Sequence, residues 1–295
     1  MVFLLPDKYI DPFTDFGFKR LFGTEDHKQL LIDFLNTLLP DYHHVQDLTF
    51  KNSEFLGNTW VDRKAIFDIY CQTNTGQRII VEMQKVKQNF FKDRSVYYAT
   101  FPIQEQARKG TWDFELTAVY TVGILDFVFD DHRHEDTLIH TVELKDQHCQ
   151  VFYDKLKFIY VELPKFTKSL EELETQGEKW LYILRHLEQF EEPPESLYTG
   201  IFKDLFEVAE IANFSPMEQG IYQQSLKAYR DNYNTAQAQL QEAREEGLQE
   251  GRQKGLQEGR QEKRVQIARQ LKALGLGISE IAVATGLTEV IIEQL

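Results

Sequence analysis

The spacing of hydrophobic residues predicts helices at both ends of the chain and strands in the middle. Residues 11–39 predict a loop and then a helix that ends before Pro40, because apolar positions recur there at steps of three and four. Those positions are Leu30, Leu31, Phe34, Leu35 and Leu38. Runs rich in β-branched and aromatic residues then predict strands. They lie at 48–50, 65–71, 77–84, 118–125 and 158–163.

Further helices are predicted between and after the strands. Residues 89–107 have a helical pattern, in which Pro102 predicts a kink or a new turn. After Pro164 the sequence is helical to about Leu240, with an interruption at 192–195. Elements in this order predict an α/β fold, with a mixed sheet core flanked by helices and an all-helical C-terminal extension.

The pattern divides the chain into four segments. We expect a core at 1–165, a helical subdomain that packs on it at 166–240, a Gly-rich polar helix or linker at 241–264, and a small helix-turn-helix-like module at 265–295. The third segment has a glycine at every fourth position, and each costs up to about 1 kcal/mol against alanine in a helix. The segment is therefore either a semi-flexible linker or a helix that packs closely on a second copy. The glycines are Gly247, Gly251, Gly255 and Gly259.

The terminal module lacks the charge of a DNA-reading element. Its second helix offers Glu289, Glu293 and Gln294, with no lysine or arginine. A helix that reads the major groove presents basic or amide groups to phosphates and bases. The module therefore favours packing or oligomerisation, and we expect a homo-oligomer formed through the C-terminal helices.

Two acidic residues lie inside the apolar strands 65–71 and 77–84. If the turn between these strands is centred on Thr75, Asp68 falls directly opposite Glu82, and Gln84 projects from the same face. Opposed carboxylates repel each other but suit a hard divalent cation, for which the backbone carbonyl of Met83 is a further oxygen ligand. The alternative is a pair of acids that are solvated at a sheet edge or paired with the basic residues Arg63, Lys64 or Arg78.

The overall charge argues against a protein covered in nucleic acid, because 33 basic and 47 acidic residues give a formal net charge of −14. Residues 85–109 have the opposite sign, with six basic and two acidic residues among interleaved aromatics. We expect Lys85 and Lys87 in this segment to contact phosphates, with some aromatics stacking on bases. For Phe90 and Phe101 we expect packing of the helix onto the sheet. The basic segment extends to Arg108 and Lys109.

Other patterns mainly exclude functions. With only two cysteines and no apolar run long enough to cross a bilayer, we expect a cytoplasmic protein without a membrane partner. No phosphate-binding glycine loop or dinucleotide fingerprint occurs, so no nucleotide cofactor is expected. Residues 130–134 with His140, His148 and Cys149 do not have the spacing of a zinc site, and we interpret them as a polar loop with scattered histidines.

The order Asp68, turn, Glu82-Met83-Gln84 resembles the PD-(D/E)XK nuclease superfamily. Within it, the chain resembles the PD-(D/E)XK nuclease family transposases, or the recombination-promoting nuclease (Rpn-like) group of putative transposases. The resemblance covers most of the chain and rests on the order and spacing of several motifs. They are 14–23, 80–84, 94–98 with Gln106 and Gly110, and 160–165.

The resemblance implies a restriction-endonuclease-like fold and metal-dependent cleavage of DNA, linked to recombination or mobile elements. It implies Asp68 and Glu82 as catalytic ligands of Mg²⁺, with Mn²⁺ as a second candidate, and Gln84 as a third catalytic residue. Asp15 is the further metal ligand that motif position implies, although an aspartate at a loop–helix junction also commonly caps the helix.

The motif positions also imply residues that contact DNA. These are Lys19, Arg94, Tyr98 and Gln106. One departure concerns catalysis: Gln84 stands where the superfamily has lysine, and glutamine brings no positive charge to the transition state. Lys85 is adjacent but points to the opposite face of a regular strand. The alternative function is a catalytically weak or inactive protein that binds DNA or a protein partner on the same fold.

Overall fold

A computed structural model describes residues 7–55, 65–107 and 113–295. The chain forms two compact units, Met1–Tyr233 and Asn234–Leu295, and their boundary falls inside the helix α6 (Pro216–Ala273). No helix in the described part of the chain is long and apolar enough to cross a membrane.

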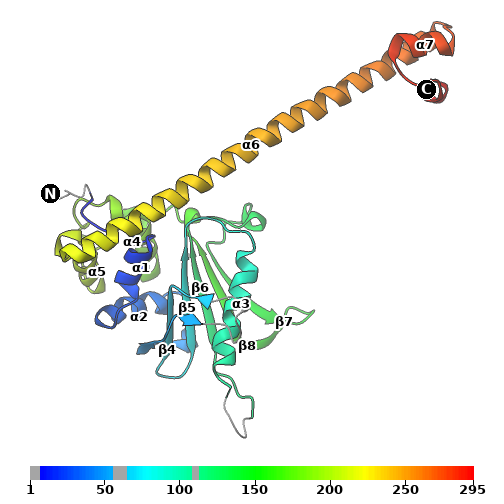
Figure 1. The fold of residues 1–295 in the computed structure, drawn as a ribbon. Helices are drawn as coiled ribbons and strands as arrows, with labels where there is room; N and C mark the ends of the chain where they lie inside the picture. The colour runs from blue at the N-terminus through cyan, green and yellow to red at the C-terminus, as the bar shows by residue number, and fades with distance from the viewer. Residues whose placement is uncertain (1–6, 56–64, 108–112) are drawn as a thin grey trace. The chain divides into compact units, whose positions relative to one another are not determined.

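The first unit is built on a six-stranded mixed sheet in the order β1-β4-β5-β6-β8-β7 (Figure 1). Strands β5, β6 and β8 are parallel, and the other pairs are antiparallel. The mixed sheet and the flanking helices confirm the predicted α/β class. The strands are β1 (Leu48–Phe50), β4 (Ile69–Thr73), β5 (Arg78–Gln84), β6 (Val119–Leu125), β7 (Ile139–Lys145) and β8 (Val151–Glu162). A separate two-stranded sheet pairs β2 (Glu54–Phe55) with β3 (Ala65–Ile66).

The two faces of the sheet carry different helices (Figure 1). One face packs against α1, α2, α4, α5 and the start of α6 in the main hydrophobic core, which includes Val81 and Trp180. The other face packs against α3, through contacts of Phe91 with Tyr160 and of Tyr98 with Phe67. These helices are α1 (Asp15–Phe22), α2 (Lys28–Asn36), α3 (Phe91–Gln104), α4 (Gln176–His186) and α5 (Ile201–Ala209).

Short 3₁₀ turns connect many of these elements. They are η1 (Glu25–His27), η2 (Asp41–His43), η3 (Asp130–His132), η4 (Leu163–Lys165), η5 (Leu170–Glu172), η6 (Leu187–Gln189) and η7 (Ile211–Asn213). Helix α3 continues through Pro102 to Gln104, so the proline causes no break before the last turn.

The first turns of α6 belong to the core unit. The Tyr222 hydroxyl accepts a hydrogen bond from the backbone N–H of Asp11 at 2.9 Å. Arg20 of α1 pairs with Glu218 of α6 at 3.0 Å. These contacts bind α6 to the N-terminal segment that leads into α1.

The second unit is entirely helical. Helix α6 runs without interruption through the Gly-rich segment, which is therefore a helix rather than a linker. No atom lies within 4 Å of a Cβ built on Gly247, Gly251, Gly255 or Gly259. The end of α6 packs against α7 (Ile278–Thr285) and α8 (Glu289–Gln294) through a small apolar core. Its buried residues are Ala268, Ile281, Leu287 and Ile292.

Candidate active site

The open end of the β4–β5 hairpin brings two carboxylates together. The observed register pairs Ile69 with Val81 and Cys71 with Ile79, as the centred turn predicts. One step beyond, Asp68 and Glu82 face each other across the hairpin. The backbone N–H of Met83 donates to Asp68 Oδ2 at 2.8 Å, and the N–H of Asp68 lies 3.4 Å from Glu82 Oε1. Backbone donors therefore fix both carboxylates.

Burial makes this carboxylate pair unusual. The Glu82 side chain is only 10% exposed. Burial and the neighbouring charge of Asp68 raise the pKa of Glu82 to about 8, against the lowering effect of Arg94. Burial also raises the pKa of Asp68, and the charge of Asp15 adds to this effect. Two buried acids that resist ionisation in each other's presence form a site that favours a bound cation.

Of the three basic residues considered as partners of the acids, the structure describes only Arg78, and it does not pair with either carboxylate. Arg78 lies at the other end of β5, where its Nε is 3.4 Å from Glu105 Oε2. Arg63 and Lys64 lie outside the described residues. Glu82 is not solvated either, because it is almost fully buried, whereas Asp68 is half-buried.

Arg94 of α3 brings a positive charge to the same face of the sheet. Its Nη2 donates to Gln84 Oε1 at 2.8 Å and lies 3.9 Å from Glu82 Oε2. The guanidinium lies 5.0 Å from the ring of Phe91 and 5.6 Å from that of Tyr98, which limits its movement. The amide nitrogen of Gln84 donates to the carbonyl of Val86 at 3.0 Å, which orients the amide oxygen toward Arg94.

Asp68 lines two clefts. One, of about 470 Å³, is lined by Asp15 of α1, by Gln84 and Gln88, and by residues of α6. The other, of about 440 Å³, is lined by basic residues that include Lys19. Asp68 is therefore accessible from both clefts, whereas Glu82 lines neither.

Helix α1 contributes Asp15 and Lys19, which form an ion pair at 2.7 Å. The cap of this helix is Thr14, whose hydroxyl accepts from the N–H of Gly17 at 3.0 Å. The helix-cap interpretation of Asp15 is therefore wrong. Instead, Asp15 borders the cleft, close enough to Asp68 to raise its pKa.

Lys85 is held on the opposite face from Gln84, as the strand alternation predicts. Its ammonium lies 3.9 Å from the ring centre of Tyr229 in α6 and 3.8 Å from Asp11 Oδ2. It also borders the larger cleft. These contacts attach the end of β5 to α6, so the structure gives Lys85 a packing role as well as a position beside the site.

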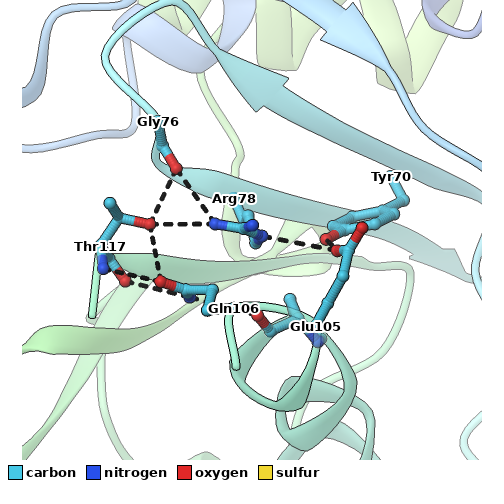
Figure 2. Close-up of polar contacts among 7 residues, drawn as sticks. Tyr70, Gly76, Arg78, Glu105, Gln106 and Thr117 are labelled. Carbon is cyan, nitrogen blue, oxygen red and sulfur yellow. Dashed lines mark hydrogen bonds and ion pairs between the residues drawn. The ribbon is translucent and has the colours of Figure 1, made fainter. Parts of the chain in front are cut away.

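Gln106 lies away from the carboxylate pair. Its side-chain oxygen accepts from the backbone N–H of Thr117 at 2.7 Å, and its nitrogen donates to the carbonyl of Pro102 at 3.1 Å. Figure 2 shows this network beside the contacts of Arg78 with Glu105. The side chain is buried, with both amide atoms engaged in hydrogen bonds, so it has a structural role at this position.

Acidic residues from another part of the chain pair with two lysines of the basic segment 85–109 and lower its local positive charge. Lys87 pairs with Asp130, and Lys92 pairs with Asp131 at 2.7 Å. Both acids lie about 40 residues away along the chain, in η3, where no local pattern indicates the contact. Arg108 and Lys109, counted in the same segment, lie outside the described residues.

Three aromatics of this segment have distinct positions. Tyr98, expected at the site, packs against Phe67 with ring centres 5.1 Å apart and lies near Arg94. Phe101 packs against the same apolar group on the sheet, as predicted. Phe90 does not: it is 78% exposed, so the packing prediction is wrong for this residue.

A group of polar residues that the sequence interpretation missed gathers around Glu162, at the end of β8. The carboxylate is fully buried and accepts from the N–H of Phe129 at 2.9 Å, while Lys165 lies 2.7 Å away. The rings of His132 and His140 stack 4.0 Å apart beside it. Potential ligand atoms of His132, Glu135 and His140 lie within 4.8 Å of one another. His132 and His140 are thus not scattered, because β7, a strand not predicted, places His140 opposite Tyr160 of β8.

A family model described as PD-(D/E)XK nuclease family transposase matches residues 12–239. The match spans the sheet, the carboxylate pair, Arg94 and the start of α6. The chain therefore belongs to this family of nuclease-like transposases, as its motifs indicate. No curated protein and no solved structure matches the chain.

Proposed function

We propose that this protein is a Mg²⁺-dependent DNA endonuclease, with Mn²⁺ as an alternative ion, that acts in DNA recombination or the movement of mobile elements. The observation that carries the proposal is the buried pair of Asp68 and Glu82, whose pKa values are both raised. Family membership supports a nuclease. The pair supports a metal as the cofactor, since a divalent cation offsets the repulsion between two carboxylates.

The donor set fits a hard cation. Asp68 and Glu82 offer carboxylate oxygens, and Asp15 offers a third from the rim of the cleft. Because the N–H of Met83 faces Asp68, the carbonyl of the same residue faces the same side of the strand. When bound, Mg²⁺ would polarise the phosphate and lower the pKa of a coordinated water. The protein's part is to hold the oxygens in place through the backbone N–H groups of the hairpin.

Gln84 and Arg94 together replace the lysine of the superfamily pattern. The amide oxygen of Gln84 holds the Arg94 guanidinium at 2.8 Å, within 3.9 Å of Glu82. A guanidinium stays charged throughout the working pH range and binds phosphate oxygens through paired donors. We assign to Arg94 the stabilisation of negative charge on the phosphate, with Gln84 as the residue that positions it.

Plasmid nicking tests the assignment. Asp68→Ala and Glu82→Ala should each abolish Mg²⁺-dependent nicking, and a chelator should do the same to the parent protein. Glu105→Gln, which alters a carboxylate at the other end of β5, is the control and should cut normally. Circular dichroism verifies that each variant is folded. If an Asp68→Ala/Glu82→Ala double variant cuts as fast as the parent, the assignment of these two residues to the active site is wrong.

The non-catalytic alternative has its own signature. A protein that binds DNA without turnover would bind neither Mg²⁺ nor Mn²⁺ in calorimetry and would retain its affinity for DNA. Such a result, together with no cleavage in any metal, would replace the endonuclease with a regulatory binding protein.

We also propose that the C-terminal unit joins two or more copies of the chain. Helix α6 contains three eight-residue segments of similar sequence, beginning at Ala238, Glu246 and Lys254. The open space above each glycine of the last two segments would accept a second helix at short distance. A variant that ends at Glu245 should have a lower oligomeric mass in light scattering than the full chain.

A further inference from the structure

Phe90 is an exposed aromatic residue in a backbone conformation that suits glycine or asparagine. It precedes the first residue of α3 with φ 61° and ψ 29°, in the left-handed region that costs a phenylalanine free energy. Its side chain is among the most exposed large apolar groups of the described chain. Neither backbone geometry nor core packing accounts for an aromatic ring at this position.

The position of Phe90 connects it to the carboxylate site. Its carbonyl accepts from the N–H of Arg94 at 2.9 Å, in the first turn of α3. Gln88, two residues earlier, borders the 470 Å³ cleft with Asp68 and accepts a hydrogen bond from the Arg94 guanidinium. Residues 84–94 therefore form one rim of the site, and the Phe90 ring stands on it.

Two lysines lie beside the ring. A hollow of about 310 Å³ is lined by Phe90 with Lys87 and Lys92, and also by the acids Asp93, Asp130 and Asp131. Both lysines pair with acids in η3, but these side chains are 40–65% exposed. Exposed pairs of this kind contribute little to stability, so a phosphate can displace the acids at small cost. An aromatic face between cations is the arrangement that binds single-stranded nucleic acid.

We propose that Phe90 stacks on an unpaired base of the DNA substrate, next to the phosphate that the carboxylate site cleaves. The proposal rests on the endonuclease function and narrows its substrate to DNA with a single-stranded or locally unpaired region. Base–aromatic stacking needs an exposed ring and no hydrogen-bond partner, and the Phe90 ring is exposed. Intact duplex keeps its bases inside the stack and would contact the lysines alone.

Binding of fluorescein-labelled oligonucleotides, followed by anisotropy in the presence of a chelator, tests this inference without cleavage. The probes are a 20-nucleotide single strand and the matching duplex. Phe90→Ala should weaken single-strand binding by roughly 5- to 150-fold and leave duplex binding almost unchanged. Phe90→Asn suits the left-handed backbone and should weaken binding equally, which excludes a folding defect as the cause.

Two further variants complete the design. Phe90→Trp should retain affinity, and the fluorescence of the new indole should be quenched by the single strand. Phe114→Ala is the matched control, because Phe114 also has a positive φ of 63° and is 76% exposed. It precedes the start of β6, which pairs with the end of β5 opposite Gln84, so its loss should change no affinity.

Unchanged single-strand affinity in Phe90→Ala, or an equal loss for single strand and duplex, would overturn the inference. Failure of the endonuclease proposal appears differently. In that case Asp68→Ala changes no cleavage rate, whereas the binding results of the Phe90 variants are unaffected.

Discussion

The strongest prediction is that removing the charge of Glu82 stabilises the folded protein. Glu82→Gln keeps the shape of the side chain and the oxygen that faces the Asp68 N–H. An unfolded glutamate ionises near pH 4.5, whereas Glu82 in the folded protein ionises at about pH 8. The free energy of unfolding of the parent should therefore fall as the pH rises from 4.5 to 8, and level off above.

The magnitude follows from the size of the pKa change. At about 1.4 kcal/mol for each pKa unit, ionising Glu82 in the folded protein costs roughly 4–5 kcal/mol above pH 8. This cost already includes the attraction of Arg94, because the arginine lowers the pKa of Glu82 to the value of about 8. We expect a gain of roughly 4–5 kcal/mol at pH 8.5 and almost none at pH 4.5.

Urea unfolding followed by circular dichroism, with a chelator present and at a series of pH values, measures this gain. The control is Glu178→Gln. Its carboxylate has a pKa lowered to about 2 by the Lys168 ammonium and two backbone N–H groups, so its charge stabilises the fold above pH 4.5. This control should lose stability at neutral pH, with the opposite sign. Adding Mn²⁺ should stabilise the parent and not Glu82→Gln. Lower stability of Glu82→Gln than of the parent at pH 8.5 would refute the reasoning.

Three more predictions concern the carboxylate site, the sheet and the C-terminal unit. Arg94→Ala should lower the nicking rate at least tenfold, and Arg94→Lys should restore part of it because the charge remains, whereas equal activity in all three would exclude Arg94 from catalysis. Gln106→Ala should lower the free energy of unfolding by about 1 kcal/mol, since the N–H of Thr117 loses its acceptor, with DNA affinity unchanged in anisotropy. In the C-terminal unit, alanine in place of four glycines should stabilise the helix by up to about 1 kcal/mol at each position. Circular dichroism should detect this as higher helicity. A lower oligomeric mass of that variant would show that the small residues face a partner, and an unchanged mass would show that they do not. The four are Gly247, Gly251, Gly255 and Gly259.

The carboxylate pair was predictable because it depends on a local rule. Strand alternation and a centred turn determine which residues of a hairpin face each other, and both are readable from residues 65–84. The same rule placed Lys85 and Gln84 on opposite faces. Asp15 could be identified only through the family resemblance, because no local pattern indicates which helix lies beside the hairpin.

The features that were missed depend on contacts between distant segments or on exposure. Strand β7 is mostly exposed at the sheet edge, so no hydrophobic pattern predicts it. The cluster around Glu162 depends on this strand and was missed with it. The pairing of Lys87 with Asp130 joins residues 43 positions apart. Phe90 was expected to pack because aromatic residues usually do, and only the three-dimensional structure places its ring in solvent.

The length of the connection between β4 and β5 determines which residues face each other at the far end of the hairpin. Residues 74–77 close it, with Gly76 at φ 93° and its N–H donating to the carbonyl of Thr73 at 3.0 Å. One added or deleted residue there would shift the pairing by one position and turn Asp68 away from Glu82. The length of a surface turn therefore limits which insertions this chain can tolerate, even though the turn lies at the opposite end of the hairpin from the carboxylates.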